Sequence, residues 1–296
     1  MKTITNITGF VTAVREAMER RLPDYEVREI SVTKMNDLTL EGLTARLKGE
    51  TAGATVYLNR AFEEHINGEK SIEAVADSMA EVILGSRGMA PVRSCEELDL
   101  SFENIRDLLS VRLISSELNK VYLEDKPHRF VADDLVLVAE IDLGNDYSTV
   151  ITNSMAEDYD ILELFDTAVG NMEKRFPAVL TSLEGAIFGD RANVLESGDR
   201  GHIEGMYVLT VDEHRFGASA LAYEGLLRRI HELMGSDFYI LPSSTDETII
   251  LKADGTADVR ALKDMVIQAN QTVVERADWL SNNVYISDAD GLHRVA

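Results

Sequence analysis

The apolar positions in the first third of the chain predict one helix, three strands and two further helices. Phe10, Val14 and Met18 recur every four residues, which places them on one face of a helix that Pro23 ends. Period-two alternation then predicts three strands, and Ser71 is a suitable N-cap for the last helix of this region. The elements after the first helix are expected over residues 26–33, 38–47, 55–58, 59–66 and 71–85.

The second of these strands changes the phase of its apolar residues at Gly42. Leu38 and Leu40 share one phase before this glycine, and Leu43 and Ala45 share the opposite phase after it. A β-bulge adds one residue to a strand and often contains glycine, so it would absorb such a shift. We therefore expect a bulge at Gly42.

The remaining two thirds of the chain alternate strand and helix patterns. A nearly continuous apolar run over residues 135–143 predicts a central strand buried on both faces. Asp160 and Glu163 are spaced as in a capping box and predict the start of a helix. The polar, glycine-rich residues 185–205 are expected to form a long mobile loop. Further strands are expected over 206–211, 238–241, 248–251 and, as an edge strand, 284–286, with helices over 218–234 and 258–272.

A hairpin followed by a helix recurs three times along the chain. This recurrence predicts an α+β fold with antiparallel or mixed sheets, arranged as two lobes. Residues 91–100 combine proline, serine and acidic residues with weak periodicity, which makes them the best candidate for a linker. We therefore expect an N-terminal lobe over residues 1–95 and a C-terminal lobe over residues 96–296.

Acidic residues strongly outnumber basic ones, and this excess narrows the classes of partner. The chain has 52 Asp and Glu against 29 Lys and Arg, a formal net charge of −23. A surface this negative repels phosphate backbones and anionic membranes, so direct binding to nucleic acid or to membranes is disfavoured. The excess favours another protein with a basic surface as partner, and it is also compatible with a mimic of nucleic acid. Solubility alone is a simpler explanation of the same charge.

Cysteine use and hydropathy indicate where the protein works. Cys95 is the only cysteine, so neither an internal disulfide nor a zinc finger can form. A chain of this size with one thiol is typical of a reducing compartment, and no stretch approaches the roughly 20 apolar residues of a membrane span. We therefore expect a cytoplasmic protein. Acidic residues follow Cys95 directly and disfavour its thiolate, which makes it a weak nucleophile.

Motifs for cofactors and metals are missing from the sequence. No Walker loop is present, and the Gly-Ser-Arg-Gly stretch at 85–88 follows a predicted helix, where it is typical of a helix stop. None of the six histidines lies three to five residues from another, as a helical metal clamp requires. We therefore expect no cofactor and no metal ion.

One segment concentrates the side chains that nucleophilic catalysis uses. Residues 241–247 read Leu-Pro-Ser-Ser-Thr-Asp-Glu at the tip of a predicted hairpin, so Ser243, Ser244 and Glu247 are the candidate catalytic residues. No histidine lies near them in sequence, and proline, serine and aspartate are also what a turn requires. An active site here would need His128, His202 or His214 to approach in space. The turn interpretation is favoured.

Several short blocks together resemble a bacterial family of domains of unknown function. The blocks span nearly the whole chain, and the resemblance implies one continuous family unit without an established activity, substrate or cofactor. Between the serines and Glu247 this family often has a histidine, whereas this chain has Thr245 and Asp246, which weakens a catalytic role that needs a histidine there. The blocks are TKMN (33–36), TVYLN (55–59), PHRF (127–130), VITN (150–153), MYVLT (206–210), FYILPSS (238–244) and LSNNVY (280–285).

The favoured hypothesis is therefore an acidic intracellular protein that binds or regulates another protein without being an enzyme. The acid excess and the missing catalytic signatures motivate it. One alternative is a hydrolase-like enzyme with its site at residues 242–247. The other is an acidic mimic of nucleic acid that inhibits a basic protein.

Overall fold

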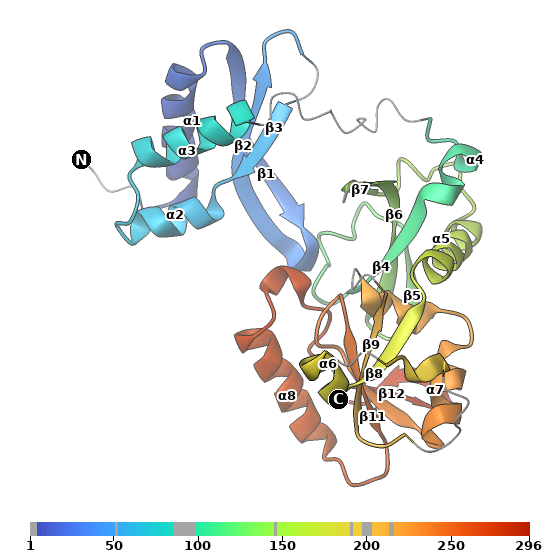
Figure 1. Ribbon diagram of the computed structural model, residues 1–296. Helices are drawn as coiled ribbons and strands as arrows, with labels where there is room; N and C mark the ends of the chain where they lie inside the picture. The colour runs from blue at the N-terminus through green and yellow to red at the C-terminus, as the bar shows by residue number, and fades with distance from the viewer. Residues whose placement is uncertain are drawn as a thin grey trace. The chain divides into compact units, whose positions relative to one another are not determined.

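The computed structural model describes residues 5–50, 53–85, 99–144, 147–189, 192–196, 203–212 and 216–296. The chain forms two compact units, Met1–Leu98 and Asp99–Ala296, and each is described by itself (Figure 1). Three antiparallel sheets with helices packed on them confirm the α+β class. All three expected pairs of adjacent strands followed by a helix are present. Most of the expected linker and Cys95 lie outside the described residues.

The first unit is a three-stranded sheet with its helices on one side (Figure 1). The predicted order of elements is confirmed. Phe10, Val14 and Met18 are fully buried against Leu43 and Ala45 of the sheet. The elements are α1 (Ile7–Arg21), β1 (Tyr25–Lys34), β2 (Leu38–Leu47), β3 (Gly53–Tyr57), α2 (Asn59–Ile66) and α3 (Ile72–Gly85).

The bulge expected at Gly42 is wrong. Strand β2 pairs with β1 without interruption from one end to the other, and Gly42 lies opposite Ile30. The change of phase therefore puts Leu40 on the face of the sheet opposite to Leu43. Gly42 is needed for a different reason, because a Cβ there would lie 2.3 Å from the carbonyl oxygen of Val56 on β3. The glycine allows the two strands to approach each other.

The second unit begins with a sheet of four strands in which β6 is central. Residues 135–141 of β6 are all buried, which confirms the predicted central strand, although its neighbours are antiparallel. Helix α5 covers one face, and the Asp160 side chain caps it by accepting hydrogen bonds from the amides of Leu162 and Glu163. The elements are α4 (Phe102–Ile105), β4 (Leu109–Ser115), β5 (His128–Ala132), β6 (Leu135–Gly144), β7 (Tyr147–Val150) and α5 (Ile161–Arg175).

A second sheet of this unit has six strands in the order β13-β12-β10-β11-β9-β8. The expected edge strand near the C-terminus is interior, because β13 pairs with its outer side. Helix α8 has nearly the predicted bounds, and it buries Leu262 and Val266, whereas Met265 is half exposed. The elements are β8 (Ala178–Ser182), β9 (Met206–Val211), β10 (Phe238–Leu241), β11 (Thr248–Lys252), α8 (Val259–Thr272), β12 (Tyr285–Asp288) and β13 (Gly291–Arg294).

The helix expected over residues 218–234 is divided in two. A buried 3-10 segment, η5 (Gly217–Ala222), precedes helix α7 (Leu226–Met234), and Gly225 separates them with a φ of 70°. That left-handed conformation is one that glycine adopts readily and that ends a right-handed helix. The pattern of apolar residues was continuous across this break, so periodicity alone could not locate it.

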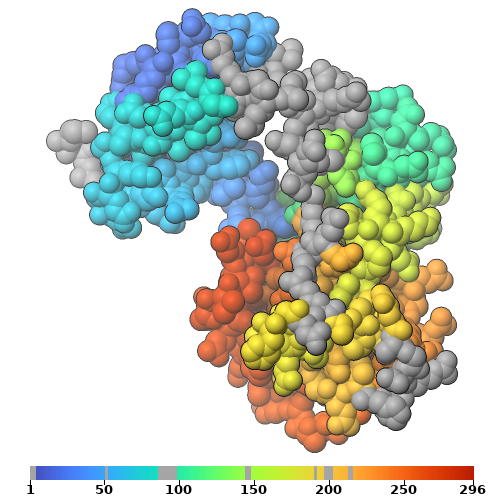
Figure 2. All heavy atoms as spheres, in the orientation of Figure 1, coloured from blue at the N-terminus to red at the C-terminus, as the bar shows by residue number. Residues whose placement is uncertain are grey.

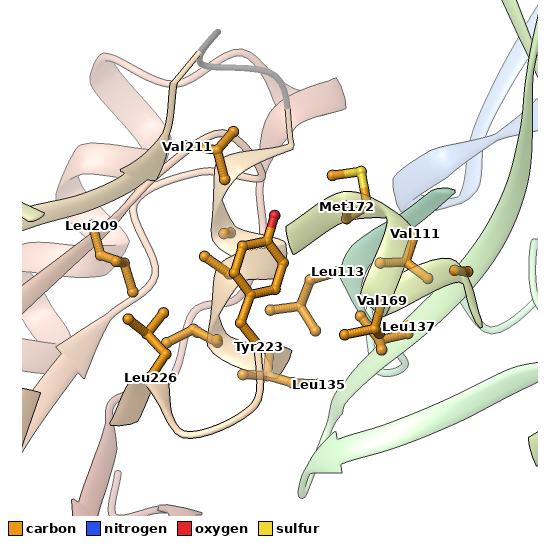
Figure 3. Packing of buried hydrophobic residues seen from close by; sticks show 14 of the residues in the cluster. Val111, Leu113, Leu135, Leu137, Val169, Met172, Leu209, Val211, Tyr223 and Leu226 are labelled. Carbon is orange, nitrogen blue, oxygen red and sulfur yellow. The ribbon is translucent and has the colours of Figure 1, made fainter. Parts of the chain in front are cut away.

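Segment η5 joins the two sheets of the second unit into one core. It packs against β9 on one side and β4 on the other. The Ser219 hydroxyl accepts a hydrogen bond from the Leu113 amide at 3.0 Å and donates to the Val111 carbonyl at 3.4 Å. Figure 3 shows residues of both sheets in one cluster, with Leu113 of β4 beside Tyr223 and Leu209 of β9 on the opposite side.

The long loop expected over residues 185–205 is wrong at its start, and the rest of its described part contains one short 3-10 turn. Gly185 lies in helix α6 (Leu183–Phe188), and residues 194–196 form a 3-10 turn, η4 (Val194–Glu196). The Asn193 side chain binds the outer edge of β8, where it accepts from the Leu180 amide at 3.0 Å and donates to the Ala178 carbonyl at 3.2 Å. A single side chain thus satisfies part of an exposed strand edge.

The packing of η5 predicts a large effect of one methyl group. In Gly217→Ala the new Cβ would lie 2.2 Å from the Asp246 carbonyl oxygen and 2.3 Å from Thr210 Oγ1. We expect a loss of about 2–4 kcal/mol of unfolding free energy in urea titrations, because the backbone must shift in a packed core. Gly170→Ala is the control, since nothing lies within 4 Å of its Cβ on α5. It should gain about 0.5–1 kcal/mol from helix propensity, and equal effects of both changes would contradict the prediction.

Candidate functional site

A buried ion pair crosses the first sheet of the second unit. The Arg112 guanidinium on β4 lies 3.0 Å and 3.3 Å from the two carboxylate oxygens of Glu140 on β6. The Glu140 side chain is 1% exposed, and Ser148 donates a hydrogen bond to it at 2.8 Å. Removing one partner of such a pair would leave a buried charge uncompensated. These three residues, with Phe216 described next, are called the Arg112 cluster.

Phe216 connects this ion pair to the predicted hairpin. Its ring covers the Arg112 guanidinium at 3.6 Å, and its backbone is left-handed with a φ of 55°. The Phe216 amide donates to a carboxylate oxygen of Asp246 at 2.9 Å, which holds the ring in place. Sequence reasoning missed this arrangement because its members come from four separate segments.

The candidate residues Ser243, Ser244 and Glu247 lie together, and their bonds build the turn between β10 and β11. The Ser243 hydroxyl donates to the Glu247 carbonyl at 3.1 Å, and the Ser244 hydroxyl accepts from the Asp246 amide at 3.1 Å. The Glu247 side chain is exposed. These contacts are those of a backbone turn, in which both hydroxyls are already engaged. A catalytic role for the three residues stays a prediction.

The histidines that an active site at this turn would need are placed elsewhere or are not described. His128 is exposed on β5, and its Nδ1 contacts the Lys126 carbonyl at 3.1 Å. His202 and His214 lie outside the described residues. Among the described residues, no group of three or more His, Cys, Asp and Glu side chains could hold a metal ion.

Two carboxylates that are distant in sequence come close beside the turn. The amide of Thr245 donates to the carbonyl of Asp278 at 2.9 Å, which brings Asp278 next to Asp246. Burial raises the pKa of the Asp278 carboxyl, and the negative charges of Asp246 and Glu275 raise it further, while Arg112 opposes the shift. The arrangement can hold a carboxyl that takes up a proton more readily than an ordinary surface acid.

A second polar cluster surrounds the buried carboxylate of Asp134, between β5 and β6. Tyr285 donates to one oxygen at 2.6 Å. Ser115, Ser281 and Asn283 donate to the other oxygen. Burial raises the pKa of the Tyr285 hydroxyl, and the charge of Asp134 raises it further, so this hydroxyl stays protonated and remains a donor. These five residues are called the Asp134 cluster.

The Asp134 cluster is a closed network that fastens the C-terminal segment. Asp134 is 4% exposed, and three of its four hydrogen-bond donors come from the block at residues 280–285. Arg294 adds an ion pair at 3.7 Å. Asn270 of α8 also holds this block, because its side chain donates to the Ser281 carbonyl at 3.0 Å. Ser281, Asn283 and Tyr285 alternate in sequence, and all three donate to Asp134, although the chain bends at residues 282 and 283. That alternation of polar residues was the signal that could have located the cluster.

Trp279, the only tryptophan, is partly buried beside the turn. Its indole N–H donates to the Val274 carbonyl at 3.0 Å, and the Arg276 guanidinium lies 4.3 Å from the ring centroid. The fluorescence of Trp279 should therefore change when the C-terminal segment that Asp134 holds in place unfolds.

The position of Asp278 predicts a pH-dependent gain in stability. A raised folded-state pKa means that ionisation of Asp278 opposes folding, so this stability is complete at acid pH and is lost as the pH rises. Asp278→Asn should therefore stabilise the protein by up to about 1 kcal/mol near pH 7 and have less effect near pH 3, where the carboxyl is mostly protonated in both the folded and the unfolded protein. Urea titrations at both pH values test this. The control is Asp264→Asn at an exposed position of α8, and the same gain at both pH values would contradict the prediction.

The Asp134 cluster predicts a large and non-additive loss of stability. Tyr285→Phe removes one donor and should cost about 1–2 kcal/mol, whereas Asp134→Ala leaves several buried donors unpaired and should cost about 3–5 kcal/mol. The double variant should cost less than the sum, because the two groups share one network. Urea unfolding followed by Trp279 fluorescence measures each loss. Strict additivity would show that the network is not coupled.

Comparisons with known proteins place the whole chain in one family. The model of a family of unknown function, DUF5688, matches residues 7–288 of the 296. Comparison with curated proteins and with solved structures finds no match. The matched region includes both units and all the blocks on which the resemblance was based, so that resemblance is confirmed. The chain therefore belongs to the family of unknown function DUF5688.

Proposed function

We propose that this protein is a non-enzymatic factor that binds another protein through an acidic surface of its second unit. The observation that carries the proposal is the unequal division of charge. Residues 99–296 contain 36 Asp and Glu against 17 Lys and Arg, a net charge of −19, whereas residues 1–98 contain 16 against 12, a net charge of −4. The second unit is about twice as long as the first, and its net negative charge per residue is still about twice as high; a need for solubility alone gives no reason for this difference.

Part of this charge lies on two segments that are neighbours in space. The Tyr159 hydroxyl donates to the Leu100 carbonyl, and the Phe102 and Tyr159 rings pack with centroids 5.6 Å apart. These contacts hold residues 99–107 beside residues 157–166, as Figures 1 and 2 show for α4 and the start of α5. The exposed acids of the two segments, called the acidic face, are Asp99, Glu103, Asp107, Glu157, Asp158, Asp160, Glu163 and Asp166.

The acidic face also offers apolar contact area. Leu162 is 69% exposed and Ile161 is 38% exposed, at the first turn of α5. Arg106 pairs with Glu103 at 3.4 Å and Arg129 with Asp166 at 2.5 Å. Most of the acids have no such partner within the face. A complementary partner would therefore present basic residues around an apolar side chain.

Two further observations support binding over chemistry. The hydroxyls of Ser243 and Ser244 are engaged in the turn, and the carboxylate of Asp134 is enclosed by its own donors.

A cytoplasmic location fits the single cysteine, Cys95. No helix of the described part combines the length and the apolar character that a bilayer crossing needs. A nucleic-acid mimic is the narrower form of the proposal, in which the captured partner is a nucleic-acid enzyme.

The acidic face predicts salt-sensitive capture of a basic protein. The full chain is immobilised and exposed to lysate of its host at low and high salt, because exposed charge pairs are screened by salt. A variant with Glu157→Gln, Asp158→Asn and Glu163→Gln should bind the captured protein about tenfold more weakly, from three lost pairs of about 0.5 kcal/mol each.

A matched variant controls for the loss of charge itself. Glu224→Gln, Asp264→Asn and Asp290→Asn remove three exposed charges from the same unit but outside the acidic face. This variant should retain the partner. Equal loss from both variants, or no partner at low salt, would overturn the proposal.

A further inference from the structure

A cavity of about 290 Å³ lies in the first unit, between α2, α3 and the end of β3. Its residues recur at helical spacing on both helices, so one face of each helix borders it. Its volume lies just below the roughly 300–1,000 Å³ found for small-molecule pockets, which suits a small organic molecule. The lining residues are Tyr57, Arg60, Ala61, Glu64, Lys70, Val75, Ser78 and Met79.

The lining combines apolar side chains with cations. Ala61 and Val75 are buried members of the core of this unit, and Met79 packs against them. Lys70 is paired with Glu64 at 2.8 Å, and this hydrogen bond lowers the pKa of the Glu64 carboxyl. Glu64 is therefore ionised and already compensated by a lysine.

Arg60 is the cation that remains most available at the cavity. Its side chain is 91% exposed, and its contact with Glu64 is long, at 3.5 Å. Lys34 adds positive charge nearby, with its ammonium 5.7 Å from the centroid of the Tyr57 ring. Two cations, Arg60 and Lys70, and one acid, Glu64, therefore line the cavity, on a chain whose net charge is −23. The local field favours an anion, although the whole molecule repels anions.

We propose that this cavity binds a small monocarboxylate with a short apolar chain. The carboxylate pairs with Arg60, and the apolar chain lies against Ala61, Val75 and Met79. An amine of the same size is disfavoured, because Lys70 already neutralises the acid that would receive it. The site belongs to the first unit and the acidic face to the second, so each proposal can fail without the other.

Binding is tested on the full chain with hexanoate as the probe. Titration of the ¹⁵N-labelled protein should give saturable shifts at α2 and α3 with a Kd of about 1 mM, the affinity expected of so small a ligand. Hexanamide and hexylammonium have the same chain without the negative charge, and both should bind at least about fivefold more weakly. Arg60→Gln should weaken hexanoate by a similar factor.

Two further variants distinguish a site from a general effect of charge. Arg28→Gln removes an arginine of β1 that is paired with Glu26 and does not line the cavity, and it should leave hexanoate binding unchanged. Ala61→Leu fills the cavity and should abolish binding, with the remaining spectrum showing whether the fold is kept. Binding of hexanamide as tight as that of hexanoate, or no saturation at about 20 mM, would overturn the proposal.

Discussion

The close approach of segment η5 to its neighbours is the constraint on which the second unit depends. Gly217 has no space for a side chain, and the Ser219 hydroxyl bonds the edge of β4 as a neighbouring strand would. Because the segment is built from small buried residues, β4 and β9 can contribute to one core. The segment thereby covers the edge of the first sheet at β4, and it packs against the second sheet at β9.

The buried charges of the second unit also hold separate segments of that unit in one arrangement. Glu140 and Asp134 are both almost fully buried, and each is surrounded by donors from other segments of the chain. Burying a carboxylate is unfavourable unless its partners are in place, so each one demands a specific arrangement of those segments. Polar side chains in this interior therefore fix the fold, and the exposed acids are the ones left available for partners.

The elements with clean periodicity could be predicted from the sequence, whereas their interruptions could not. Strands β2 and β9 have the bounds that their apolar patterns predicted, and β9 is buried on both faces. The break at Gly225 depends on a positive φ, and the need for a glycine at position 42 depends on the close approach of β3. At the candidate site, the sequence located the hydroxyls of residues 243–244 but not Asp278 or Phe216. Those contacts join positions far apart in the chain, and no local pattern encodes them.

The division of charge between the two units separates two kinds of ligand. The second unit carries most of the negative charge and exposes it beside Leu162, which suits a basic protein surface. The first unit has a smaller excess of acids, and two cations, Arg60 and Lys70, outnumber the one acid, Glu64, among the residues that line its cavity. If the chain carried its acids evenly, a positive site of this size would lose much of its field to neighbouring carboxylates. The concentration of acids in one unit is thus consistent with the protein binding proposed for that unit and with the small anion proposed for the other.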